Sequence, residues 1–342
     1  MNINKTILCF NWNTSQIPLC ESYLDNKTQN RIDRPRGTFT KTTPCYNPLF
    51  FDEIENEIIR FSSTLQILVF LTEGDKEEGT WFHSDFIPNK LANLNIQPPP
   101  GQTGTQNIPK FRLLTRDKFA GQPYNKIYTV IRMSIYVPVN NKDTKVIELN
   151  KGYLFNDNKL ICEATSSIDD DLEYYEDASI LTLYVQSSMG KIAFVGIQYS
   201  EQNPDPGRVC IKQLENKFIN NKGLNHVFLM GDFNNNPGIS NGESYEFIKI
   251  SDQFYDEYRE ESRPTGYVDF RDKNSEIDYL PSYQNQQEDR IGYHDRILNK
   301  SITPPTNQIK CIEYKLIKGF PMNNTAPTHF GILGIYEIPG IK

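Results

Sequence analysis

Apolar residues in this chain occur mainly in short runs that are typical of β-strands. Eight segments are rich in β-branched or aromatic residues and stop at polar or turn-forming residues. One stretch, HVFLMGDFNNNP at 226–237, passes from a buried-strand pattern directly into aspartate and asparagine side chains. The predicted strands are 5–10, 65–73, 128–139, 180–186, 191–199, 225–233, 311–317 and 330–338.

Helical spacing of apolar residues is less frequent, so strands predominate. Two loops interrupt the strand patterns: a Pro/Gly-rich stretch near 95–109 and a strongly acidic one near 167–179. Because strand patterns resume on both sides of each loop, we expect residues 1–342 to form a single domain with two surface insertions. The predicted helices are 47–63, 207–221 and 242–254.

The net charge and the spacing of the cysteines indicate which partners the protein can bind and in which cellular compartment it is expected. With 36 Lys and Arg against 43 Asp and Glu, the formal net charge is −7, and no basic run is present. This balance argues against a nucleic-acid partner. The six cysteines lack CxxC spacing, which favours reduced thiols and a cytoplasmic or other reducing intracellular compartment. No segment reaches the roughly 20 apolar residues of a membrane span, so no transmembrane segment is expected.

Polar residues stand where several strand-like segments stop or start. Such ends can converge on one edge of two packed sheets, which is where sites of layered folds collect. Carboxylate and amide oxygens suit Mg²⁺ or Mn²⁺, whereas the histidines and thiols show no zinc-binding spacing. We therefore expect a divalent-metal site completed by substrate phosphate. The residues at these ends are Asn13, Glu73, Asp232, Asn234, Asp295 and His329.

Several motifs around these residues resemble those of the endonuclease/exonuclease/phosphatase superfamily, in the same order over nearly the whole chain. The most specific one is LPSYQNQQEDRIGYHDRIL at 280–298, which is similar to a segment of the inositol polyphosphate 5-phosphatases. The resemblance implies an α/β (α+β) fold, a four-layered sandwich of two packed mixed β-sheets flanked by helices. We expect the amino and carboxyl halves each to supply one sheet. The shorter motifs are FNWN (10–13), FLTEG (70–74), NKG (150–152), GDFN (231–234) and APTHF (326–330).

The resemblance also implies a role for each matching residue. Asn13 and Glu73 would hold the metal. Asp232 would align the attacking water, and Asn234 would bind a phosphate oxygen. Asp295 and His329 would form a hydrogen-bonded pair beside the scissile phosphate, where an imidazole oriented by a carboxylate can accept a proton. The residues expected to bind substrate are Lys151, Tyr199, Tyr283, Arg290 and Arg296.

Three positions depart from the 5-phosphatase pattern in ways that matter for catalysis. Gln198 replaces a histidine that contacts the scissile phosphate, Gln284 replaces a phosphate-binding lysine, and Thr328 replaces an aspartate of the metal site. Each such loss typically lowers a rate by about 10² to 10³. His294 stands at the family's cysteine position and is interpreted as a packing or supporting residue.

Three functions therefore remain open. The first is a metal-dependent phosphoesterase that hydrolyses a phosphate monoester of an inositol phosphate or phosphoinositide, so that its partner is a phosphorylated small molecule or a lipid headgroup. The second is a catalytically impaired descendant that acts as a binding or structural protein. The third is a DNase or apurinic-type endonuclease, which the net charge opposes.

Overall fold

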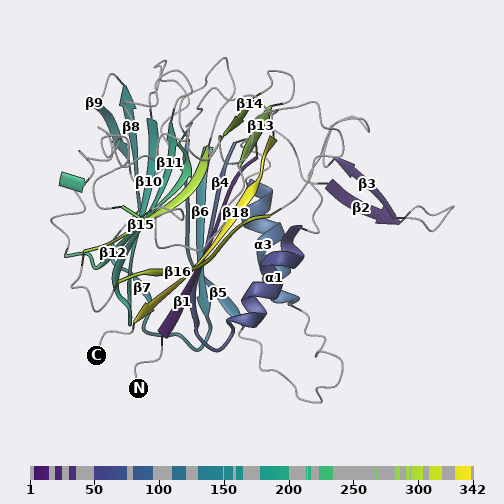
Figure 1. Cartoon of the computed structure of the whole chain (residues 1–342), viewed down its shortest axis with the longest axis horizontal. Coiled ribbons are helices and arrows are strands. Elements are labelled where there is room, and N and C mark those ends of the chain that lie inside the picture. Colours follow the sequence, from purple (N-terminus) through teal and green to yellow (C-terminus); the bar gives the residue numbers. More distant parts are fainter. Residues whose placement is uncertain are drawn as a thin grey trace.

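A computed structural model of the chain places its strands in the centre and its longest helix on one side (Figure 1). The structure describes residues 4–14, 20–24, 31–35, 50–74, 80–94, 110–120, 130–148, 150–156, 159–164, 178–199, 213, 215–216, 223–233, 267–268, 282–285, 290–292, 294–302, 308–317 and 328–339.

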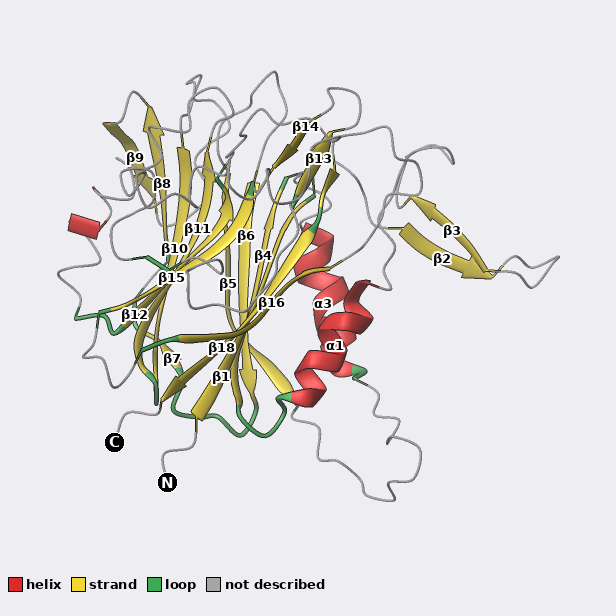
Figure 2. Cartoon of the chain, viewed as in Figure 1, coloured by secondary structure: helices red, strands yellow, loops and turns green. Residues whose placement is uncertain are grey.

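Two mixed β-sheets form the two central layers, which confirms the predicted sandwich (Figure 2). The first sheet contains, in spatial order, β16 (Lys310–Ile317), β18 (Gly331–Pro339), β1 (Asn4–Asn13), β4 (Leu65–Glu73), β6 (Val130–Pro138) and β5 (Phe111–Ala120). The second contains β15 (Asp295–Ser301), β12 (His226–Asp232), β11 (Gly190–Tyr199), β10 (Ala178–Ser187), β8 (Lys151–Asn156) and β9 (Lys159–Ala164), with β7 (Lys145–Val146) beside β10.

Two small sheets accompany the large ones. Three short strands, β14 (Arg290–Gly292), β13 (Tyr283–Asn285) and β17 (Thr328–His329), form a sheet in that order. Strands β2 (Cys20–Leu24) and β3 (Arg31–Pro35) pair with each other. All eight strands predicted from the sequence are present, while β2, β3, β5, β7, β8, β9, β15 and the three short strands β13, β14 and β17 were not predicted.

One part of the predicted architecture is wrong: the two halves of the chain do not each supply one sheet. The carboxyl-terminal strands β16 and β18 join the first sheet, where β18 pairs antiparallel with β1 and covers its edge. The pairing satisfies backbone groups of β1 that would otherwise lie at an open edge. It also brings the chain before β18, which carries His329, to the end of the sandwich where β1 finishes.

The core between the sheets is apolar and is filled by side chains from both. This packing holds the ends of β4 and β12 in a fixed relation, which the site described below requires. From the first sheet the core receives Ile7, Val69, Leu71, Met133 and Ile135, and from the second Leu183, Phe194, Met230 and Ile297, all of them buried.

Helices cover the outer face of the first sheet. They are α1 (Phe50–Arg60), the π-helical turn η1 (Phe82–Phe86) and α3 (Ile87–Ala92). Their aromatic residues pack against those of β1: the ring of Phe82 meets Trp12 edge-on with centroids 5.7 Å apart and stacks on Phe10 with centroids 6.1 Å apart. The predicted helix at 242–254, most of the one at 207–221 and the loop 95–109 lie outside the described residues, as does 165–177, the main part of the acidic loop.

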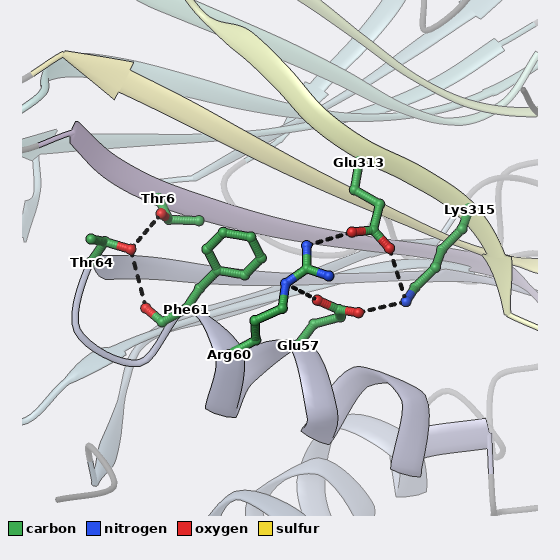
Figure 3. Close-up of polar contacts among 7 residues, drawn as sticks. All are labelled: Thr6, Glu57, Arg60, Phe61, Thr64, Glu313 and Lys315. Carbon is green, nitrogen blue, oxygen red and sulfur yellow. Dashed lines mark hydrogen bonds and ion pairs between the residues drawn. The ribbon is translucent and has the colours of Figure 1, made fainter. Parts of the chain in front are cut away.

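A network of four charged side chains attaches α1 to β16 (Figure 3). Lys315 Nζ lies 2.7 Å from Glu57 Oε1 and 3.2 Å from Glu313 Oε1, and Arg60 bridges the same two carboxylates. The network raises the pKa of Lys315 and lowers that of Glu313, although partial burial opposes both shifts. It lies on the helical side of the sheet and has a structural role.

Within the described part of the chain, no helix combines the length and apolar character that crossing a membrane requires.

Candidate active site

Four of the predicted polar residues lie at strand ends that meet at one end of the sandwich. Strands β1 and β4 run parallel, and Asn13 is directly opposite Glu73 at their carboxyl ends. In the second sheet β12 and β15 run antiparallel, which places Asp232, the last residue of β12, opposite Asp295, the first residue of β15. Each sheet thus contributes one pair of polar residues.

Hydrogen bonds join the two pairs across the sandwich. The backbone amide of Asp232 donates to Oε1 of Glu73 at 2.7 Å. Nδ2 of Asn13 donates to Oδ2 of Asp232 at 2.9 Å. Glu73 is 1% exposed, Asp232 3% and Asn13 8%. The hydrogen bonds therefore form in a region of low dielectric constant, where they are strong.

Gly231 permits the close approach of Glu73 to the end of β12. Its φ of +142° lies in a region that L-residues rarely adopt. A Cβ at this position would lie 1.8 Å from the carbonyl oxygen of Ile197 and 2.6 Å from Oε1 of Glu73. The glycine of the GDFN motif is therefore required both by the backbone and by the carboxylate that bonds to the next amide.

Asp295 and His329 form a buried pair within the same site. Nδ1 of His329 lies 2.7 Å from Oδ2 of Asp295, and the two residues are 6% and 0% exposed. Strand β13 and the residue before it position both: the backbone amide of Asp295 donates to Oγ of Ser282 at 2.9 Å, and Tyr283 is the register partner of His329. The backbone amide of Phe330 donates to the carbonyl oxygen of Ser282 at 2.8 Å.

His294 joins this group, although the sequence suggested a supporting role for it. Its ring stacks on Tyr283 with centroids 4.0 Å apart and planes 8° apart, and its centroid lies 5.7 Å from that of His329. Its carbonyl oxygen accepts a 2.8 Å hydrogen bond from the amide of Phe233. One potential ligand atom from each of Asp232, His294 and His329 lies within 4.8 Å of the other two.

The electrostatics of the site fit a bound cation. Burial, together with the negative charges of Asp232 and Asp295, raises the pKa of Glu73 well above its ordinary value. Burial also raises the pKa of Asp295, against the opposing effect of His329. Oε2 of Glu73 and Oδ1 of Asp295 have no hydrogen-bond partner among the described residues. Because buried carboxylate oxygens without partners are costly, a divalent cation beside them would stabilise the site.

Of the other residues expected to bind substrate, some lie in the site and others have contacts elsewhere. Tyr283 lies in the site, and Tyr199 packs its buried ring against Phe233 with centroids 5.4 Å apart. Lys151 forms an ion pair with Glu163 between β8 and β9. Arg296 is 0% exposed and follows Asp295 in β15, so the two side chains point to opposite faces of the sheet. The burial of Arg296 places its guanidinium in the interior rather than at a solvent-exposed surface.

Several predicted positions are only partly described or not described. Asn234 lies outside the described residues. Arg290 is in β14, and Gln284 and Thr328 are register partners in β13 and β17, but their side chains are not described. Gln198 is the register partner of Asp232 in parallel β11, and its Oε1 has no hydrogen-bond partner among the described residues.

Sequence reasoning underestimated His294 and did not identify Ser282. His294 directly precedes Asp295, so any strand start that brings Asp295 to the site also brings His294 near it. Ser282 had no comparable signal because its bonds to Asp295 and Phe330 depend on how β13 pairs with β17, which is not local in the sequence.

Comparison with solved structures identifies the fold. No protein-family model and no curated protein sequence matches the chain. The inositol polyphosphate 5-phosphatase domain of SPSynaptojanin, solved with inositol (1,4)-bisphosphate and calcium ion, is similar at 13% identity and a TM-score of 0.54, over 98% of this chain and 85% of that chain. The Cimex nitrophorin ferrous NO complex is similar at 10% identity and a TM-score of 0.56, over 98% of this chain and 99% of that one.

The composition-based expectation against a nucleic-acid partner does not hold, and a third likeness is to a structure that contains DNA. The chain is similar to D. rerio TDP2 complexed with a single-strand DNA product, at 11% identity and a TM-score of 0.45, over 97% of this chain and 98% of that chain. The expectation was wrong because a net charge of −7 describes the whole chain, whereas phosphate contacts depend on local groups.

The predicted resemblance is confirmed at the level of the fold. The SPSynaptojanin domain and the Cimex nitrophorin share only 13% and 10% of their residues with the chain, so they establish its architecture and leave its substrate open. The chain has the two-sheet sandwich fold that is also found in the SPSynaptojanin 5-phosphatase domain and in the Cimex nitrophorin.

Proposed function

We propose that this chain is a divalent-metal-dependent phosphoesterase that hydrolyses a phosphate monoester of an inositol phosphate or of a phosphoinositide headgroup. The observation that carries the proposal is the buried Asp295–His329 pair, at 2.7 Å, which lies beside Asp232 and the hydrogen-bonded Glu73. An oriented imidazole next to a group of carboxylates is what general acid–base chemistry on a phosphate ester requires.

The pair defines which nitrogen of His329 would exchange a proton with the substrate or leaving group. Nδ1 of His329 is hydrogen-bonded to Asp295, so Nε2 is the nitrogen that we propose to exchange a proton with the substrate. The carboxylate fixes the tautomer and stabilises the imidazolium form. Asp295 is itself held by Ser282, so the imidazole is oriented before the substrate arrives.

Glu73 and Asn13 are the residues proposed to hold the cation. The amide nitrogen of Asn13 donates to Asp232, which leaves its oxygen as the ligand atom, and Glu73 would contribute Oε2. A Mg²⁺ or Mn²⁺ ion at these oxygens would neutralise phosphoryl charge. Asp232 would align the attacking water, with one carboxylate oxygen fixed by Asn13.

Substrate recognition is assigned to groups around this centre. Tyr283 borders His329, with ring centroids 4.8 Å apart, and is the described residue best placed to contact a bound phosphate or inositol ring. The other proposed phosphate ligands are Asn234, Arg290 and Lys151. Tyr199 and Arg296 are also proposed ligands, but both side chains are buried, so we assign them a role in supporting the site. The inositol bisphosphate bound to the SPSynaptojanin domain supports this substrate class.

Phosphate release from a panel of soluble inositol phosphates and phosphoinositide vesicles, with Mg²⁺ or Mn²⁺ and with chelator, tests the proposal. The panel includes single-stranded DNA, for which strand cleavage is the readout. Metal-dependent phosphate release from an inositol phosphate supports the proposal. Cleavage of DNA without phosphate release would assign the chain to the nuclease class instead.

A non-catalytic binding protein is the second candidate, and a specific observation favours it. Gln198 is the register partner of Asp232 at the position where the 5-phosphatase pattern has a phosphate-contacting histidine. The likeness to a Cimex nitrophorin, solved as a ferrous NO complex, shows that this fold also occurs in a protein that binds a ligand of another kind. Under this candidate the native chain is silent on the whole panel, and Gln198→His together with Gln284→Lys restores metal-dependent phosphate release.

A further inference from the structure

The cluster of Asp232, His294 and His329 has a donor set unlike that of the proposed Mg²⁺ ligands Glu73 and Asn13. It offers one carboxylate oxygen and two imidazole nitrogens, and the three ligand atoms lie within 4.8 Å of one another. The three residues are 3%, 4% and 6% exposed, so this is a buried group rather than a chance cluster on the surface. They come from the end of β12, the residue before β15 and the short strand β17.

Each member of the cluster is held in place by a different neighbour. Asp295 bonds to Nδ1 of His329, which leaves Nε2 as its ligand atom. Asn13 bonds to one carboxylate oxygen of Asp232. His294 is stacked flat against Tyr283. Metal-binding histidines characteristically donate their second nitrogen to a carboxylate, as His329 does here, and such support fixes the ring and strengthens the ligand.

Two nitrogens and one oxygen favour a particular class of cation. Imidazole suits zinc and its neighbours in the first transition series, whereas Mg²⁺ prefers an all-oxygen shell. Three protein ligands with a further position for water form the usual arrangement of a reactive zinc site. Ligand atoms on one zinc ion lie about 3.4 Å apart when each is about 2.1 Å from the metal. The three ligand atoms, which lie within 4.8 Å of one another, would therefore need to approach by at most about 1.4 Å to share one ion.

We infer that Asp232, His294 and His329 form a binding site for a transition-metal dication of the zinc class, distinct from the oxygen ligands proposed for Mg²⁺. His294 is the residue that creates this preference, since without it the cluster has one nitrogen donor. The inference concerns binding and does not depend on the proposed hydrolysis. Where hydrolysis also occurs, the ion would occupy the same nitrogen of His329 that exchanges a proton, so the two uses of the site compete.

Cobalt spectroscopy on the full chain tests the inference without reference to activity. Metal-free protein is titrated with Co²⁺, whose visible absorption intensifies in a tetrahedral site with nitrogen ligands, and Zn²⁺ is then added as competitor in excess Mg²⁺. The site predicts one equivalent of Co²⁺ that Zn²⁺ displaces and Mg²⁺ does not. Absence of the band, or its loss on adding Mg²⁺ alone, would overturn the inference.

Two variants separate the site from other histidines. His294→Phe keeps the ring that stacks on Tyr283 but removes both nitrogens, and should weaken Co²⁺ binding at least about tenfold. His226→Gln changes a buried histidine in the interior of the second sheet and should leave binding unchanged. Equal binding by wild type and His294→Phe contradicts the inference.

A measurement on the wild-type chain covers the case in which His294→Phe does not fold. The chain has four histidines, and ring ¹⁵N resonances report metal coordination directly. Zn²⁺ should shift two of the four imidazoles and leave the other two unchanged. A shift of one ring or none would contradict the site, whatever the behaviour of the variant.

Discussion

The backbone amide of Asp232, at the end of β12, donates a 2.7 Å hydrogen bond to Oε1 of Glu73, at the end of β4. These residues belong to different sheets, so the bond links the two layers at the point where the candidate site lies. It uses one oxygen of Glu73 for structure, while Oε2 has no hydrogen-bond partner among the described residues. Glu73 thus connects the packing of the sandwich to the binding of a cation.

The first prediction concerns Glu73→Gln, which keeps an oxygen acceptor for the Asp232 amide. The pKa of Glu73 is raised, which means that its charged form destabilises the folded state. This loss of stability is complete once the pH is above the pKa of Glu73 in the folded state, and it is absent when the pH is well below its pKa in the unfolded state. Glu73→Gln should therefore have a higher Tm than wild type in chelator at neutral pH. With Mn²⁺ present the order should reverse or the difference disappear, because only wild type gains a ligand.

Thermal unfolding with and without Mn²⁺ and calorimetric Mn²⁺ titration measure both effects. Glu313→Gln, which removes a carboxylate from the ion network on β16, serves as control. Equal Mn²⁺ binding by wild type and Glu73→Gln would place the cation elsewhere.

The second prediction concerns Gly231→Ala, which places a methyl group 1.8 Å from the Ile197 carbonyl oxygen. The backbone cannot keep its φ of +142° without strain, so we expect a loss of at least about 3 kcal/mol in the free energy of unfolding. Mn²⁺ affinity should fall as well, because Oε1 of Glu73 is displaced. Chemical denaturation and Mn²⁺ titration are the measurements.

Gly223→Ala is a matched control for Gly231→Ala. Gly223 also has a positive φ, +61°, but an added Cβ meets no atom within 4 Å among the described residues. Its cost should be about 1 kcal/mol, the price of the backbone conformation alone. Similar losses from the two substitutions would show that the close approach of Glu73 is unimportant.

The third prediction concerns Asp295→Asn in the proposed phosphoesterase. The amide cannot stabilise the imidazolium form of His329, so kcat should fall by about 10² or more, while KM changes little. Steady-state kinetics with the best substrate of the panel give both values. A fall confined to KM would indicate that the pair binds substrate in the ground state and takes no part in the transition state.

The fourth prediction concerns acid sensitivity and His226. Burial lowers the pKa of His226 to about 4, from 6.5 for an ordinary imidazole. The unfolded chain binds the proton more tightly, so this stability is present above about pH 6.5 and is lost as the pH falls toward about 4. Between pH 7 and pH 5 the loss from this group should be about 2 kcal/mol.

Denaturation midpoints of wild type and His226→Gln at these two pH values give the contribution of His226 as a difference. The variant should be less acid-sensitive than wild type by that amount. His83, whose pKa is also lowered by burial, remains in both proteins, so its effect cancels. An identical acid response in the two proteins would contradict the burial of the His226 ring.

The sequence by itself determined the local features of this protein. Alternation and apolar runs predicted β4 at its observed bounds of Leu65–Glu73, and they predicted β1, β12 and β18 to within a few residues, because these patterns record burial along one segment. The polar residues Asn13, Glu73 and Asp232 could be selected as strand ends for the same reason.

Only the tertiary structure decided how those ends combine. The pairing of β18 with β1 depends on contacts between opposite ends of the chain, and no local pattern records them. The same holds for the position of His294 against Tyr283, which depends on strand pairing around β13. Residue type and period are properties of a segment, whereas the distance between Asp232, His294 and His329 is a property of how three segments pack.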